Sequence, residues 1–438
     1  RHFVSGIMAL IGIGSKKTSG WKATISVAMA NYIEAGSIIA GASGLSLWTD
    51  YLRLDNIMVG ILGAFSANAF GAAFGALLGG WLCDKYGRKF IYTYDLVVYM
   101  LGVLVIACSF SFPMLLAGFM ITGVAVGAGV PASWTYIAEE APHARRAAHV
   151  GAAQLAWSIG PVVTFVLAVL LAPMGLAGNR IIFLHLFVIA FVTWYIRQGL
   201  SESGLWKKDK AREQAGQARG VKTRHPYIEL FANRRNWRPL ALLLGIYFFW
   251  NLVAGAMGFF MPYVYETVGH LTQRQANLLQ AALWFCTVAA TWGGFMMLGD
   301  RMSRRVLYGI GAAMGLVAWT LLTFVGMGWA MLGVFVVLWG LSAGIGAQAF
   351  YGLWASELFP TRYRASAQGA MFFIVRAGIG VWSFVFPTVL ARLSFKVAGI
   401  TMLVFLAIAL VIGIALAPET RGKTLEQIEE ERYGKPKS

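Results

Sequence analysis

The chain alternates between long apolar stretches and short polar connections. Twelve of the apolar stretches are long enough to cross a bilayer as a helix, which takes about 20 residues. They lie at roughly 23–47, 57–82, 90–110, 113–138, 147–172, 180–197, 239–267, 275–299, 306–325, 328–355, 366–391 and 397–417. One connection, 198–238, is much longer than the others and separates two sets of six stretches. The pattern predicts an all-α membrane protein with twelve transmembrane helices in two six-helix halves.

Two polar motifs occur twice, about half the chain apart. Asp84–Lys89 and Asp300–Arg305 each close an apolar stretch and lie 216 positions apart (84 to 300). Glu139…Arg146 and Glu357…Arg364 share one internal spacing and lie 218 positions apart (139 to 357). Two independent motifs at nearly one offset indicate a duplicated unit, so we expect the halves to be pseudo-symmetric. In transporters built from such repeats, one half rocks against the other around a midplane site.

Glycines recur at four-residue spacing within several stretches, which places them on one face of a helix. They are Gly71, Gly75 and Gly79, then Gly123 and Gly127, then Gly340 and Gly344. No hydrophobic force joins helices in lipid, and small residues let their backbones approach closely instead. We therefore expect these faces to pack against neighbouring helices.

Composition supports a bilayer location. Charged residues make up 13% of the chain and apolar residues 58%, whereas soluble domains carry roughly 25% charged residues. The formal net charge is +17, and about 30 of the 36 Lys and Arg lie in alternate connections, which marks those connections as cytoplasmic. We attribute the charge to topology rather than to nucleic-acid binding. Both termini are then expected on the cytoplasmic side of a multi-pass protein of the cytoplasmic membrane.

These features divide the chain into an N-terminal half at 1–197, a basic cytoplasmic linker at 198–238, a C-terminal half at 239–417 and a cytoplasmic tail at 418–438. Enzyme chemistry finds no support, because no Ser-His-Asp, Cys-His or phosphate-loop set converges. Cys83, Cys108 and Cys286 lack the spacing of a metal site or a disulfide framework. We expect no enzyme activity, no cofactor and no metal.

Several motifs resemble those of a known family. The segment Gly80–Lys89 resembles the loop signature of the major facilitator superfamily, and Pro418–Glu426 looks like the C-terminal tag of its sugar porters. Glu202 and Ser203, with Trp206, look like a reduced form of their mid-chain tag. The resemblance implies twelve spans in two halves, alternating access and a monomer. It also implies a set of gating residues, namely Asp84, Arg88, Glu139, Arg146, Asp300, Arg304, Glu357 and Arg364.

Arg376 lies in the middle of the eleventh stretch. It follows Arg364 by 12 residues (364 to 376), or about 18 Å of helix. A charge at that depth requires a reason, and an arginine suits a carboxylate, which it grips in bidentate fashion. The spacing from Pro360 also resembles that of the superfamily's aromatic-acid and organic-acid proton symporters. The alternative is a structural ion pair with Glu34 or Asp95.

Glu34 in the first stretch is the predicted proton carrier, with Asp95 in the third as the other candidate. In proton-coupled sugar porters the coupling acid is an aspartate at about the position of Ser37. Glu34 lies one helical turn earlier on the same face, so it can take that role. The alternatives are that Glu34 pairs with an arginine, and that Asp95 is structural or part of the gate.

The remaining predicted substrate-binding residues are polar and aromatic side chains of the fifth, seventh and tenth stretches. They are Gln154, Trp157, Trp250, Asn251, Gln348, Tyr351 and Trp354. Gln154 has the spacing of the sugar porters' hydroxyl-binding glutamine, and Asn251 falls near the first of their paired glutamines. Packing or an interfacial position is the alternative for each aromatic residue.

The chain is thus predicted to be a secondary transporter that imports a small polar metabolite by alternating access, with protons. Arg376 favours an organic acid or sugar acid as the substrate. A neutral sugar or polyol porter, by symport or uniport, is the first alternative. A drug:proton antiporter is the second, because Gly160-Pro161 matches part of the signature of that class. The third alternative is a non-transporting nutrient sensor built on the same fold. It is less favoured, because such sensors usually carry longer cytoplasmic extensions.

Overall fold

The computed structural model describes residues 18–65, 67–218 and 224–434, and their regular structure is helical. The six predicted N-terminal stretches correspond to a first group of helices, with short 3-10 turns η1 (His143–Arg145) and η2 (Ala172–Met174) at the connections. The helices are α2 (Thr18–Leu52), α3 (Asn56–Ala64), α4 (Phe70–Tyr86), α5 (Arg88–Ala107), α6 (Phe112–Glu140), α7 (Arg146–Leu171) and α8 (Leu176–Arg197).

The second group repeats this order. It consists of α11 (Trp237–Thr267), α12 (Gln273–Ala290), the π-helical turn η4 (Thr291–Met296), α13 (Arg304–Val325), α14 (Trp329–Ile345), α15 (Ala347–Glu357), α16 (Arg364–Arg392) and α17 (Phe395–Leu416). The polar segments form α9 (Gly204–Ala218), α10 (Pro226–Ala232), α18 (Leu425–Tyr433) and the 3-10 turns η3 (Arg234–Asn236) and η5 (Thr361–Tyr363).

Two predicted helices are interrupted. The second stretch is split into α3 and α4, and the tenth into α14 and α15 at Gly346. Ten helical stretches of the described residues are apolar and long enough to cross a membrane. The helix α4 is not among them because it has only 17 residues. The predicted all-α membrane fold is confirmed, with these breaks as additions that the apolar pattern did not indicate.

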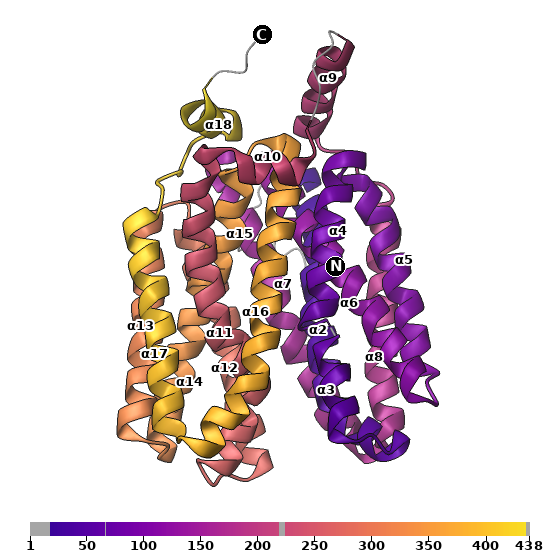
Figure 1. The fold of residues 1–438 in the computed structure, drawn as a ribbon, viewed down its shortest axis with the longest axis vertical. Coiled ribbons are helices and arrows are strands. Elements are labelled where there is room, and N and C mark those ends of the chain that lie inside the picture. Colours follow the sequence, from indigo (N-terminus) through magenta and orange to yellow (C-terminus); the bar gives the residue numbers. More distant parts are fainter. Residues whose placement is uncertain (1–17, 66, 219–223, 435–438) are drawn as a thin grey trace.

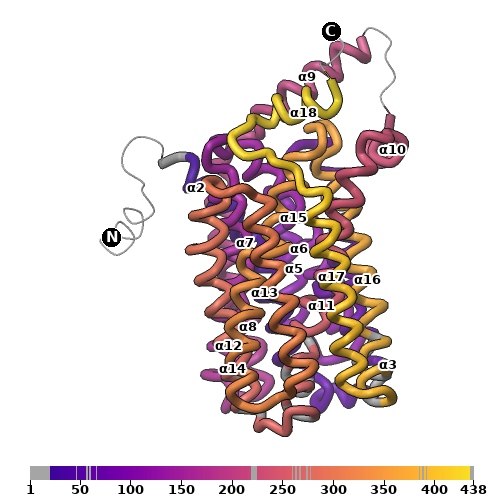
Figure 2. Tube along the Cα trace, turned by 90° about the vertical axis from the view of Figure 1, so that its left-hand side faces the viewer, coloured from indigo at the N-terminus to yellow at the C-terminus, as the bar shows by residue number. Residues whose placement is uncertain are grey.

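The two groups stand side by side with their helices upright (Figure 1). The segments α9, α10 and α18 lie together at one end of the bundle, which we call the linker end (Figures 1 and 2). At this end α4 of the first group packs closely on α16 of the second. A Cβ atom on Gly80 would lie 2.5 Å from the carbonyl oxygen of Ala365, and one on Gly369 would lie 2.2 Å from that of Ala76. The bundle is therefore closed at the linker end.

Within the first group, glycine brings α4 and α6 into backbone contact. A Cβ atom on Gly75 would lie 2.1 Å from the carbonyl oxygen of Val124, and one on Gly127 would lie 2.2 Å from that of Ala72. These glycines belong to the four-residue patterns found in the sequence. Because glycine has no side chain, the two backbones can approach closely, as the spacing predicts.

Gly75→Ala should therefore lower the thermal stability of the purified protein, because the backbone of α6 has no side chain that can move away. Overpacking of this kind costs about 1–3 kcal/mol. The matched control is Gly333→Ala in α14, where an added Cβ atom meets nothing within 4 Å. Its melting temperature should stay the same or rise, since alanine is the better helix former. Equal melting temperatures for the two variants would contradict the assigned contact.

Candidate functional site

A cavity lies between the two groups of helices, with a volume of about 80 Å³. Its wall is formed by α2 and α7 of the first group, by α11, α12, α14, α15 and α16 of the second, and by Asn68 between α3 and α4. The lining residues are Ala35, Ile38, Ile39, Asn68, Gln154, Trp157, Pro161, Trp250, Asn251, Ala254, Gly255, Met257, Gly258, Met261, Gln280, Leu283, Trp284, Thr287, Trp339, Ala343, Gln348 and Arg376. Residues from both groups of helices thus line one cavity.

Most of the predicted substrate-binding residues line this cavity. They are Gln154, Trp157, Trp250, Asn251, Gln348 and Arg376. Tyr351 and Trp354 lie elsewhere in the packing of the second group. Tyr351 stacks on Tyr247 with ring centroids 3.9 Å apart, and Trp354 packs against Phe350 at 4.9 Å. Of the three residues predicted in the tenth stretch, Gln348 lines the cavity, whereas Tyr351 and Trp354 pack against other rings.

Arg376 is already paired within the protein. Its guanidinium forms an ion pair with Glu34 of α2, and both side chains are almost fully buried. The guanidinium also donates to the backbone and side-chain oxygens of Asn68, at 3.3 Å each. The second carboxylate oxygen of Glu34 accepts a hydrogen bond from the indole of Trp157 at 3.1 Å. The structure therefore joins α2 and α16, from opposite groups, by a neutral pair beside the cavity.

The other predicted proton-coupling residue, Asp95, lies inside the first group. It pairs with Arg197 of α8 at 3.4 Å, and Arg197 also donates to the backbone oxygens of Ser26 and Val27. Asp95 is not among the described residues that line the cavity. Of the two carboxylates, Glu34 is the one that contacts cavity residues.

Polar atoms in the cavity wall lack protein partners. Among the described residues, the buried side-chain oxygens of Gln154 and Gln280 and the indole nitrogen of Trp250 have no hydrogen-bond partner. Sequence reasoning missed Gln280 of α12. Gln280, Trp284 and Thr287 recur at intervals of four and three residues, a helical face that the sequence displays. Unpaired donors and acceptors in such a wall are available to a polar ligand.

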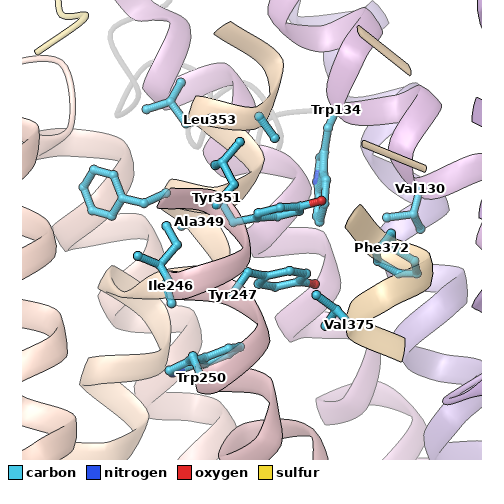
Figure 3. Packing of buried hydrophobic residues seen from close by; sticks show 14 of the residues in the cluster. Val130, Trp134, Ile246, Tyr247, Trp250, Ala349, Tyr351, Leu353, Phe372 and Val375 are labelled. Carbon is cyan, nitrogen blue, oxygen red and sulfur yellow. The ribbon is translucent and has the colours of Figure 1, made fainter. Parts of the chain in front are cut away.

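An aromatic layer separates the cavity from the linker end. Tyr247 and Tyr351 stack in parallel, and Trp134 of α6 meets the edge of Tyr351 at 5.5 Å (Figure 3). Phe372 of α16 contacts the opposite side of Trp134 at 6.4 Å. Rings from both groups contribute to this layer, which closes the cavity on the side that faces the linker end.

Beyond the aromatic layer lies a buried charge cluster that contains four of the predicted gating residues. The carboxylate of Glu139 binds Arg88 at 2.7 Å and Arg364 at 2.7 Å, and Arg88 also pairs with Asp84 at 2.9 Å. Asp84 in turn accepts hydrogen bonds from the backbone N–H groups of Ala365 and Ser366, at 3.3 and 2.6 Å. Its carboxylate thus caps the N-terminus of α16 in the other group, where a negative charge is favoured.

The second group supplies the matching cluster. Glu357 binds Arg304 at 2.7 Å and Arg146 at 2.9 Å, and Arg304 pairs with Asp300 at 3.4 Å. Asp300 accepts hydrogen bonds from the first two N–H groups after Arg146, at 3.1 and 3.0 Å, and so caps α7. The pKa of the Asp300 carboxyl lies above its usual value because burial raises it by more than these amides and Arg304 lower it. Each cluster holds two carboxylates and two arginines, so its net charge is zero.

The sequence tags complete the two clusters in parallel. Glu202 accepts hydrogen bonds from the N–H groups of Arg88 and Lys89, at 3.0 and 2.9 Å. In the second group, Glu419 accepts from the hydroxyl of Ser303 at 2.9 Å, and Thr420 contacts Glu357. Glu202 and Glu419 are 217 positions apart (202 to 419), which is within one residue of the offsets of the other two motifs. The mid-chain and C-terminal tags are therefore one element present in both halves.

Comparison with known proteins agrees with this architecture. The family model described as "Sugar (and other) transporter" matches residues 14–431. The chain is 47% identical over 418 residues to the minor myo-inositol transporter IolF of Bacillus subtilis, covering 95% of each chain. It is 27% identical over 419 residues to a putative metabolite transport protein of Haemophilus influenzae, covering 93% of this chain and 98% of that one.

The fold also matches a solved structure of the major facilitator superfamily. The proton:xylose symporter XylE superimposes with a TM-score of 0.81 at 17% identity, covering 94% of this chain and 99% of the other. The resemblance seen in the loop and tag motifs is confirmed, and so is the expectation of a transporter rather than an enzyme. The chain therefore belongs to the sugar (and other) transporter family of the major facilitator superfamily, and it is a multi-pass integral membrane protein.

Proposed function

We propose that this transporter moves a neutral cyclic polyol of the inositol class. The observation that carries the proposal is the ion pair between Arg376 and Glu34, because it neutralises the cationic side chain in the cavity wall. A substrate carboxylate would have to displace Glu34 from Arg376 and leave that carboxylate without its partner. Arg376 therefore no longer argues for an organic acid as the substrate. A neutral wall suits a neutral polyol instead.

The other polar groups of the wall suit hydroxyls. Gln154, Gln280, Gln348 and Asn251 carry carboxamides, each of which can donate to and accept from a hydroxyl group. Apolar and aromatic residues occupy the space around them, as expected for a ring whose faces carry C–H bonds. The 47% identity to a myo-inositol transporter supports the same substrate class.

We further propose proton symport with Glu34 as the proton carrier. Glu34 and Arg376 belong to opposite groups of helices, so their pair has to loosen when the two groups move relative to each other. Protonation of Glu34 removes its charge and lowers the cost of that separation. Trp157 connects Glu34 directly to the cavity, where a bound substrate can influence its environment.

The linker end is proposed to face the cytoplasm, with both termini on that side. The positive charge of the linker supports this orientation. Because both charge clusters close the linker end, we propose that substrate exchanges at the opposite end in this conformation. Import follows if a proton gradient directed inward drives the cycle.

Uptake into proteoliposomes tests the proposal. We expect radiolabelled myo-inositol to accumulate when the lumen is more alkaline than the medium, and unlabelled glucuronate to compete poorly. Collapse of the pH gradient should abolish accumulation but leave equilibration. Uptake of glucuronate with no inhibition by inositol would overturn the polyol assignment, and accumulation that ignores the pH gradient would overturn symport.

A further inference from the structure

Gln280 and Gln154 line the cavity from helices of opposite groups. Gln280 lies on α12 one helical turn before Trp284, and α12 runs toward the linker end, where η4 and Asp300 meet α7. Gln154 lies one turn to the linker side of Trp157 on α7. Trp157 and Trp284 contact each other across the two groups, with ring centroids 5.4 Å apart. The two glutamines therefore lie on opposite sides of this contact along the bundle axis.

The surroundings of Gln280 offer no structural role for its carboxamide. Its side chain is 8% exposed, and its buried carboxamide oxygen has no hydrogen-bond partner among the described residues. Several cavity residues on α11 and α12 are apolar, including Met257, Met261 and Leu283. Polar side chains within membrane spans face a partner or an aqueous path, and a buried unpaired oxygen is rare. Because Gln280 lines the cavity, a molecule that enters the cavity can supply the missing partner.

We propose that Gln280 is a specificity-determining residue that binds a substrate hydroxyl on the side of the molecule facing away from the linker end. Gln154 binds the opposite side, so the cavity recognises hydroxyls at two edges of one ring. This assignment rests on the proposed polyol function, and it explains how the transporter would select among polyols. A fully hydroxylated ring satisfies both glutamines, whereas a molecule with one polar edge leaves a carboxamide unpaired.

The test compares Gln280→Met with wild type in binding measurements on the purified protein, using myo-inositol and the set of mono-deoxy-inositols. Methionine keeps the length of the side chain and removes the carboxamide. We expect Q280M to bind myo-inositol about five- to tenfold more weakly, the loss of one hydrogen bond. For the one deoxy-inositol that lacks the hydroxyl bound by Gln280, wild type and Q280M should have equal affinity.

Two further variants control the comparison. Gln217→Met makes the same chemical change on exposed α9 and should leave every affinity unchanged. Gln280→Asn retains a shorter carboxamide and should give an intermediate loss, which keeps the assignment testable if Q280M does not fold. Unchanged binding in both Gln280 variants, or an equal loss for all deoxy-inositols, would overturn the role of Gln280 alone. Wild-type protein that binds no polyol would overturn the proposed function and this role together.

Discussion

Glu34→Gln is expected to destabilise the protein by about 3–5 kcal/mol and to abolish accumulation of substrate. The substitution leaves the guanidinium of Arg376 buried beside the cavity without a counter-charge, and arginine stays protonated in proteins. Arg376→Met should cost less at low pH, because the carboxylate that it leaves behind can bind a proton. The loss of stability in Arg376→Met should therefore shrink as the pH falls from about 8 to 5, while that of Glu34→Gln should not.

Melting temperatures of the purified variants across this pH range measure both effects. The control is the double variant Glu34→Gln/Arg376→Met, in which no charge is left unpaired. It should recover most of the stability but none of the proton-driven accumulation. If the double variant is as unstable as the sum of the single variants, the two side chains do not act as a pair, and the polyol argument built on their mutual neutralisation is wrong.

Glu139→Gln is expected to open the linker end. The substitution leaves Arg88 and Arg364, which come from different groups of helices, without the carboxylate that joins them. A cost of about 3 kcal/mol confined to the closed state shifts its population by more than a hundredfold. Arg364 then loses its ion-pair partner among the described residues, and transport should fall because the substrate path no longer closes.

Cys83 reports this opening. It is fully buried in α4 one helical turn from Gly80, which contacts α16, whereas Cys108 is exposed and Cys286 is partly exposed. In a Cys108→Ser/Cys286→Ala background, a thiol reagent should label Cys83 slowly in the parent and rapidly in the Glu139→Gln variant. Glu140→Gln changes the adjacent, exposed carboxylate and should label as slowly as the parent. Slow labelling in Glu139→Gln would show that Glu139 does not hold the end closed.

The helices were predictable because apolar length is a local pattern. The partners within each charge cluster were not, because Glu139 pairs with Arg364, and Glu357 with Arg146, across the two groups. Apolar length indicates the spans, and the repeat of Glu139…Arg146 as Glu357…Arg364 indicates two equivalent clusters. Helix breaks such as the one at Gly346 were not predictable, since the apolar stretch continues through them. The depth of Arg376 followed from helical rise. The sequence left Glu34 and Asp95 as alternative partners of Arg376. It could not decide between them, because Glu34 is 342 positions away along the chain and no local pattern links the two residues.

The cavity wall was predicted in part. Gln154 was found through its spacing from Arg146, and Asn251 through its resemblance in position to the first of the sugar porters' paired glutamines. Gln280 has no such counterpart and was missed. Tyr351 and Trp354 share a helical face with Gln348, yet they pack against other rings. A helix surrounded by apolar neighbours on every side gives no pattern that separates a cavity wall from a packed interface.

The reciprocal capping of α16 by Asp84 and of α7 by Asp300 has a consequence for the speed of the cycle. Each carboxylate reaches across to the opposite half, so one hinge rotation pulls both from their helix termini simultaneously. Releasing them one after the other would require the halves to slide past each other, against the close backbone contact at Gly80. We therefore expect both caps to break in the same step. We expect this concerted step to contribute to the barrier that the cycle has to cross.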